Sequence, residues 1–184
     1  GLTCSSPHWI TPSSPKDVAI VPSRTLPSLT ITNALPRHVD VLVVGLTTSG
    51  AQQVPKTIDG GFTKRFGMSV LDMATSLGAK ASAESKWTLP AIDGGPRIVV
   101  VGLESEQPSA EDLRRAAGTG VRHAASLAGS DALSVAVSLG SSDTDQLAAV
   151  AEGALLGSYQ YQPISAAPAN SDKINAITVV HSGE

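Results

Sequence analysis

Cysteine is almost absent from this chain of 184 residues, in which Cys4 is the single one. One cysteine excludes a disulfide within the chain and any zinc site built from cysteine ligands. Cys4 lies in residues 1–16, a stretch rich in serine, threonine and proline with neither helical nor strand periodicity. We therefore interpret residues 1–16 as a flexible N-terminal tail, Cys4 as a chance thiol, and residues 17–184 as a single domain.

Aromatic residues are scarce at 3%, and charged residues make up only 16% of the chain, with a net charge of −3. The core must therefore be built from small aliphatic residues, which allow the backbones of helices and strands to approach closely. Nucleic-acid binding is disfavoured, because it needs clustered lysine and arginine. We interpret the nearest basic cluster, Arg114, Arg115 and Arg122, as the solvated outer face of a helix.

Long apolar runs are also missing, and no stretch approaches the roughly 20 apolar residues of a membrane-spanning helix. The N-terminus shows no basic start followed by an apolar core, the pattern of an export signal. The sequence therefore predicts a cytoplasmic protein without a membrane partner. The single cysteine agrees with a reducing compartment.

The chain contains instead short apolar runs that end at turn residues. Residues 40–46 and 97–103 show this pattern, which is typical of strands buried on both faces of a parallel sheet. Further strands are predicted over residues 17–21, 28–32, 87–90, 132–139 and 174–180, of which 87–90 is an edge strand because prolines flank it. Strands and helices alternate in the second half. We therefore expect an α/β domain with three α/β/α layers and a mixed, mainly parallel sheet.

Two helices are predicted between the later strands. The first covers residues 111–128, with Ser109 and Asp112 as a capping box and Gly129 as the stop signal. Gly120 lies among alanines on its inner face, where close approach to the sheet explains the missing side chain. The second helix is capped by Asp143 or Asp145 and runs to about residue 157.

An earlier helix is predicted over residues 60–78, with a break or kink near Gly67. Apolar residues recur in it at spacings of three and four, which defines an inner stripe. This stripe consists of Phe62, Phe66, Val70, Met73 and Leu77.

Three glycine-rich stretches, residues 45–50, 59–61 and 94–95, invite comparison with phosphate-binding loops. None of them matches GxGxxG or GxxxxGK[ST], so we interpret them as ordinary turns.

Tyr159 and Tyr161 follow the last helix in an i, i+2 pattern typical of an extended segment. We interpret their rings as packed under the sheet, with a place in an interface as the alternative.

Side chains that could carry chemistry are scattered along the chain. His8, His38, His123 and His181 show neither HxxxH nor HExxH spacing, and no GxSxG elbow is present. Carboxylates occur mostly at helix caps and loops, whereas a two-metal hydrolase needs several that converge on ions about 3.5–4 Å apart. We expect His123 to be a surface or half-buried helix residue. The sequence assigns no catalytic, cofactor-binding or metal-binding residue.

Four segments, taken together in their order and spacing, identify a protein family more specifically than any one of them does alone. They are VLVVGL at 41–46, VVVGL at 99–103, DLRRAAGTGVRHA at 112–124 and AVAEGALLGSYQY at 149–161. With them the chain resembles, from about residue 17 to residue 180, the N-terminal domain of the leucyl (cytosol) aminopeptidase family. The resemblance implies a macro-domain-like fold. It also implies membership of a hexameric exopeptidase that uses two divalent metal ions, Mn or Zn, to remove N-terminal residues, preferably leucine, from peptides.

The resemblance places the family's catalytic residues in a C-terminal domain. Its Asp-Thr-Gly-Gly stretch and its Asn-Thr-Asp-Ala-Glu-Gly-Arg block do not occur in this sequence. We therefore expect an accessory domain that is inactive alone, serves assembly or substrate access, and has the C-terminal catalytic domain of the same polypeptide as partner. The alternative is a stand-alone macro-like module that binds ADP-ribose or a nucleotide, although no Asp or Asn is recognisably placed for this.

Overall fold

The computed structural model describes residues 27–48, 54–159 and 173–181, which form one sheet and its covering helices. The strands are β1 (Ser28–Thr32), β2 (Val41–Leu46), β3 (Lys86–Leu89), β4 (Arg97–Gly102), β5 (Leu133–Ser138) and β6 (Ile174–Val180). The helices are α1 (Lys56–Phe66), α2 (Val70–Ser76), α3 (Ala110–Ser126) and α4 (Thr144–Ser158). The strand predicted over residues 17–21 and the ring of Tyr161 lie outside the described residues.

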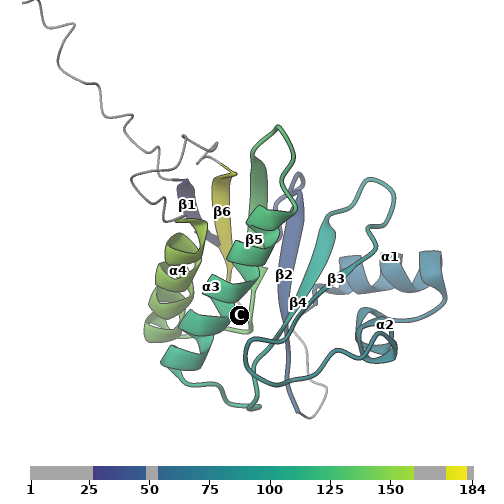
Figure 1. Cartoon of the computed structure of the whole chain (residues 1–184), viewed down its shortest axis with the longest axis horizontal. Coiled ribbons are helices and arrows are strands. Elements are labelled where there is room, and N and C mark those ends of the chain that lie inside the picture. Colours follow the sequence, from purple (N-terminus) through teal and green to yellow (C-terminus); the bar gives the residue numbers. More distant parts are fainter. Residues whose placement is uncertain (1–26, 49–53, 160–172, 182–184) are drawn as a thin grey trace, which may run out of the picture.

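The sheet has the order β1-β6-β5-β2-β4-β3. All neighbouring strands are parallel except β3, which runs antiparallel to β4 at one edge. Figure 1 shows α3 and α4 on one face of the sheet, whereas α1 and α2 lie behind it, near β3 and β4. This arrangement confirms the predicted three-layer α/β/α fold and the edge position of β3.

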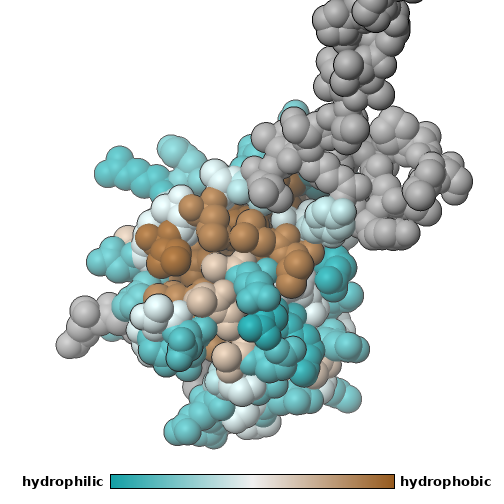
Figure 2. All heavy atoms as spheres, turned by 90° about the vertical axis from the view of Figure 1, so that its left-hand side faces the viewer, coloured by the Kyte–Doolittle hydropathy of each residue, from teal (hydrophilic) through white to brown (hydrophobic). Residues whose placement is uncertain are grey.

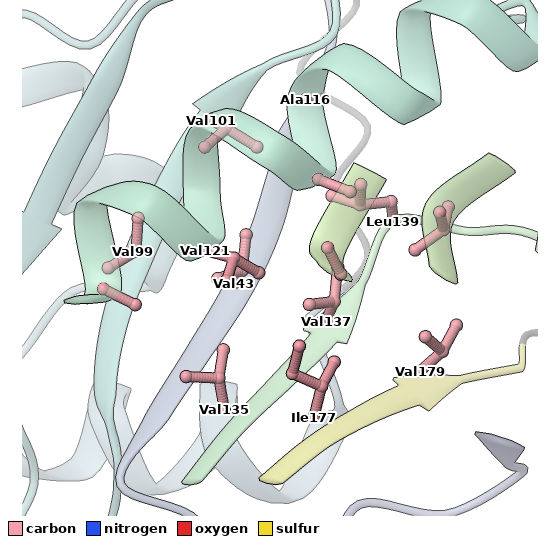
Figure 3. Close-up of a cluster of buried hydrophobic side chains, with 14 of the residues drawn as sticks. Val43, Val99, Val101, Ala116, Val121, Val135, Val137, Leu139, Ile177 and Val179 are labelled. Carbon is pink, nitrogen blue, oxygen red and sulfur yellow. The ribbon is translucent and has the colours of Figure 1, made fainter. Parts of the chain in front are cut away.

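The two faces of the sheet carry separate apolar clusters because successive side chains of a strand point to opposite sides. Val43 of β2 packs under α3 and α4, and Leu42 and Val44 pack against α1 and α2. Every residue of β2 is buried, as its continuous apolar sequence predicts. Figure 3 shows Val43 and other valines of the strands pointing toward Val121 of α3.

Glycines set the distance between α3 and its neighbours. A Cβ atom at Gly120 would overlap Cγ1 of Val43, which confirms the predicted close approach of this helix to the sheet. A Cβ atom at Gly153 of α4 would overlap the carbonyl oxygen of Arg114 in α3. Residues without a side chain therefore allow α3 to contact β2 on one side and α4 on the other.

The predicted starts of α3 and α4 are confirmed, whereas the helix predicted from residue 60 begins at Lys56. Ser109 Oγ accepts a hydrogen bond from Asp112 N at 3.1 Å, and Asp112 Oδ2 accepts one from Ser109 N at 3.0 Å. Asp143, the first of the two candidates, caps α4 by accepting from Gln146 N at 2.8 Å. The stop signal assigned to Gly129 is wrong, because α3 ends at Ser126, its C-cap Leu127 has right-handed backbone geometry, and Gly129 has no positive φ.

The break predicted near Gly67 within residues 60–78 is confirmed, since Gly67 adopts the left-handed conformation at φ 76° and separates α1 from α2. The helical phase restarts at Ser69, which caps α2. The inner stripe is therefore wrong at its last member: Leu77 is 44% exposed, and Ala74 takes the buried position. Residues 59–61 lie inside α1, so the interpretation of this stretch as a turn is also wrong.

Tyr159 has the predicted extended backbone after α4, with φ −80° and ψ 118°. Its side chain does not pack under the sheet, however, and is 54% exposed. The interpretation of its ring as a packed core residue is therefore wrong. The last turn of α4 instead directs both Leu156 and Tyr159 outward, because Gly153, Ala154 and Gly157 form the side of the helix that is buried.

Candidate functional site

The carboxyl ends of parallel strands are the usual place for a ligand in an α/β sheet, at the point where the chain changes its direction of winding. Here β2 leads to α1 on one face, whereas its neighbours β4 and β5 lead to α3 and α4 on the other. A hollow lies beside these strand ends. It is lined by Thr47, Leu103, Glu106, Leu139 and Gln146, among others.

The helix N-termini at this edge are occupied by carboxylates of the chain itself. Asp112 closes the capping box of α3, and Asp143 accepts a hydrogen bond at the start of α4. Hydrogen bonds from the backbone and then from the side chain of Ser109 lower the pKa of Asp112, so that its carboxylate stays ionised. A phosphate at this edge would meet negative charge where anion sites offer free N–H groups. The geometry does not favour the ADP-ribose alternative.

Hydroxyl groups are buried at the same strand ends. Thr47, Ser138 and Ser141 are at most 8% exposed, and Ser141 Oγ has no hydrogen-bond partner among the described residues. Glu106 is the one titratable residue among the described residues that line the hollow. A lone carboxylate lacks the second group that paired acid–base chemistry or a two-metal site requires.

The histidines lie far apart in the fold. His38 lies beside a wide hollow at the amino ends of the strands, and His181 follows β6, where its backbone N–H donates to Thr32 O at 2.6 Å. His123 lies on α3, and His8 lies outside the described residues. Within residues 27–48, 54–159 and 173–181, no three side chains of His, Cys, Asp or Glu are placed to hold a metal ion.

His123 joins α3 to the edge strand β3. Its Nε2 atom lies 2.6 Å from Thr88 Oγ1, and the ring is half-buried, as expected from the sequence. Burial lowers the pKa of His123, and the positive charge of Lys86 lowers it further. The neutral ring is therefore favoured, in a position that stabilises the helix–strand contact.

The wide hollow at the amino ends of the strands contains the turn at Gly94–Gly95, where Gly94 has φ 74°. Asp40, in the same hollow, accepts hydrogen bonds from Ser134 N at 2.9 Å and Ser134 Oγ at 3.1 Å. This carboxylate thus links the starts of β2 and β5. Its contacts have a structural explanation, and the glycine turn closes a loop as the sequence predicts.

Two of the arginines of α3, Arg114 and Arg115, are paired with carboxylates. Arg114 contacts Glu111 and lies 3.5 Å from Glu152 of α4, and Arg115 lies 3.9 Å from Asp112. Their charges are therefore balanced locally, which agrees with the interpretation of this face as solvated.

None of the helices in the described part of the chain is long and apolar enough to cross a bilayer.

Sequence reasoning missed a group of exposed apolar side chains. Leu29 and Ile31 of β1 are 39% and 50% exposed, and Leu156 of α4 is 59% exposed. The sequence does show that Leu29 and Ile31 are apolar residues two positions apart, so that they lie on the same face of the strand. Its meaning depends on the position of β1 at the sheet edge, which the sequence does not show.

Comparison with known proteins gives a consistent result. The family model described as "Cytosol aminopeptidase family, N-terminal domain" matches residues 43–165. A probable cytosol aminopeptidase of Cutibacterium acnes is 32% identical over 87% of this chain and 32% of its own length. One of Nocardia farcinica is 37% identical over 77% of this chain and 28% of its own length. The chain thus spans about a third of the length of these relatives.

A solved structure has the same fold. The bottromycin maturation enzyme BotP superposes with a TM-score of 0.52 at 24% identity, over 78% of this chain and 27% of that enzyme. At this identity the likeness concerns the fold alone.

Proposed function

Because this chain belongs to the cytosol aminopeptidase family, whose N-terminal domain matches residues 43–165, we propose that it is the non-catalytic N-terminal domain of a leucyl aminopeptidase. In this proposal residues 17–184 form the domain and residues 1–16 a tail. The domain serves assembly or substrate access. The parent enzyme is a cytoplasmic hexamer that uses two divalent ions, Mn or Zn, in its C-terminal domain to remove N-terminal amino acids from peptides.

The observation that carries this proposal is the extent of the family match. It includes most of β2 and all of the elements from α1 to α4, and therefore most of both apolar clusters. This chain aligns with only about a third of the length of the curated relatives, 32% of one and 28% of another. This ratio supports a domain within a larger enzyme.

The chemistry of the reaction supports a non-catalytic role. Two-metal peptide hydrolysis needs carboxylates that bridge the ions, an activated water and a cation near the developing oxyanion. Several carboxylates of the described residues instead have structural partners: Asp112 closes a helix cap, Glu152 lies near Arg114, and Asp40 accepts hydrogen bonds from Ser134. Their positions suit a domain that stabilises an assembly and leaves the reaction to other residues.

An antibody against this chain tests the proposal in the source cells. It should capture a polypeptide about three times as long as this chain, because the alignment with one relative covers 32% of that relative's length. The captured protein should release p-nitroaniline from Leu-p-nitroanilide, and a chelator should abolish this activity. A captured polypeptide without chelator-sensitive activity would contradict the proposal.

A further inference from the structure

Strand β1 is an edge of the sheet without a charged residue. It pairs with β6 on one side, and no other described strand pairs with it. Its sequence, SLTIT, is uncharged. The opposite edge, β3, begins with Lys86 and is followed by Pro90, and both residues are known to protect edge strands from pairing. Of the two edges, β1 is therefore the one suited to accept a further strand.

Apolar side chains accompany this edge. Leu29 and Ile31 pair in register with Ile177 and Val179 of β6, which belong to the apolar cluster under α3 and α4. The apolar face of the sheet thus continues to the molecular surface. Figure 2 shows apolar side chains gathered on the side of the molecule that carries β1 and α4. We call Leu29, Ile31, Leu156 and Tyr159 the β1–α4 patch; their side chains are 39–59% exposed.

We propose that the β1–α4 patch binds a second copy of this chain, with β1 antiparallel to β1 of the copy around a two-fold axis at Thr30. In an antiparallel pair, directly opposite residues point to the same face. The axis therefore places Leu29 opposite Ile31 of the copy, on the face that carries α4. The two sheets become one continuous sheet, and both α4 helices lie on the same side of it.

The lack of charged residues in the patch favours a second copy as the partner. In a two-fold interface, a residue near the axis meets its own symmetry mate, so a charged residue there would repel itself. Thr30 at the axis and the four residues of the patch are uncharged, so self-pairing has no such cost. Main-chain hydrogen bonds along β1 supply affinity, as in other cases of strand addition. This inference is independent of the proposed function, since it concerns surfaces of this chain alone.

Sedimentation equilibrium of the 184-residue chain tests the interface. At about 10–100 μM, a range that covers weak interfaces, the mass should approach twice 18.7 kDa. Thr30→Lys and Thr30→Glu should each be monomeric, because like charges directly opposite each other destabilise a strand pair. An equimolar mixture of the two variants should regain the dimer mass, since the axis then brings opposite charges together.

A matched control is Leu77→Lys, which changes an apolar side chain of α2 that is 44% exposed but lies outside the patch. It should leave the dimer mass unchanged, and equal melting temperatures should show that the variants fold. A wild-type chain that stays monomeric, variants that still dimerise, or a mixture that stays monomeric would each overturn the proposal. Dimerisation only after deletion of residues 1–26 would overturn it too, in favour of the chain's own N-terminal segment as occupant.

Discussion

At the scale of single residues, the missing side chain at Gly120 sets the distance between α3 and the sheet. Its position is buried, and the space that a Cβ atom would need is filled by Cγ1 of Val43. Val43 is itself fully buried and has a stiff, branched side chain, so it has little room to move. The packing of the whole face therefore depends on this glycine.

Gly120→Ala should lower the free energy of unfolding by about 1–3 kcal/mol through overpacking, and Gly120→Leu should lower it more. This is the net change, in which overpacking outweighs the roughly 1 kcal/mol that alanine gains over glycine in a helix. Gly60→Ala is the control, because a Cβ atom at this exposed position in α1 meets nothing within 4 Å, so this change should stabilise. Urea denaturation measures all three. A Gly120→Ala variant as stable as the wild type would contradict the packing.

His123 makes the stability of the fold depend on pH. Burial, followed by Lys86, holds its pKa below the ordinary value of 6.5, so the unfolded chain binds a proton more readily than the folded chain. The free energy of unfolding should therefore fall as the pH is lowered through about 6.5 toward the pKa of the folded state, and level off above 6.5. Urea titrations between pH 5 and 8 should show a smaller slope for His123→Gln. Equal slopes in both proteins would refute this role.

At the scale of elements, α3 and α4 contact each other through their backbones. Gly153 faces Arg114 O, and a Cβ atom at Gly157 would lie 2.5 Å from Gly118 O. The seam between the two helices is therefore made by glycines on both sides. It brings Arg114 of α3 within 3.5 Å of Glu152 of α4.

Gly153→Ala should destabilise the chain by about 1–3 kcal/mol, because the added methyl group would overlap a carbonyl group of the main chain, which cannot rotate away. Gly60→Ala again serves as the matched helical control. Thermal and urea unfolding should both show that the wild type is more stable than the Gly153→Ala variant. The seam would be disproved by a Gly153→Ala variant with an unchanged midpoint.

The carboxylates at the starts of α3 and α4 predict that ADP-ribose does not bind at the carboxyl ends of the strands. Ser109 Oγ and Asp143 Oδ1 already accept from the helix N–H groups of Asp112 and Gln146, and the Asp112 carboxylate adds negative charge at the start of α3. Titration calorimetry at 1 mM ADP-ribose should therefore give only the heat of dilution. Saturable heat that disappears on substitution of Thr47 or Gln146, which line the hollow, would support the alternative function instead.

The helices and strands were largely predictable from the sequence. Which side of an element is buried was harder to predict. β2 and α3 are marked locally, by an apolar run and by the Ser109–Asp112 capping box. The phase of α2 was wrong at Leu77, because it depends on how the chain restarts after Gly67. The order of the strands follows from contacts distant in sequence and has no local signal.

At the scale of the whole molecule, the family and the fold class could be predicted from the sequence, whereas the exposed apolar surface could not. Four segments in a fixed order sufficed for the resemblance, and the family match confirms it. The β1–α4 patch was missed because Leu29 and Ile31 look like core residues of a strand. Only the pairing of β1 with β6 at the edge shows that they lie at the surface.

The proposal that this chain contributes no catalytic residue is tested most directly by an assay of the isolated 184-residue protein. It should release no p-nitroaniline from Leu-p-nitroanilide when Mn²⁺ or Zn²⁺ is supplied and host aminopeptidases have been removed. The reason is that no three His, Cys, Asp or Glu side chains of the described residues are placed together to hold a metal ion. Turnover that follows the protein through purification and disappears with a chelator would contradict the proposal and place an active site in this chain.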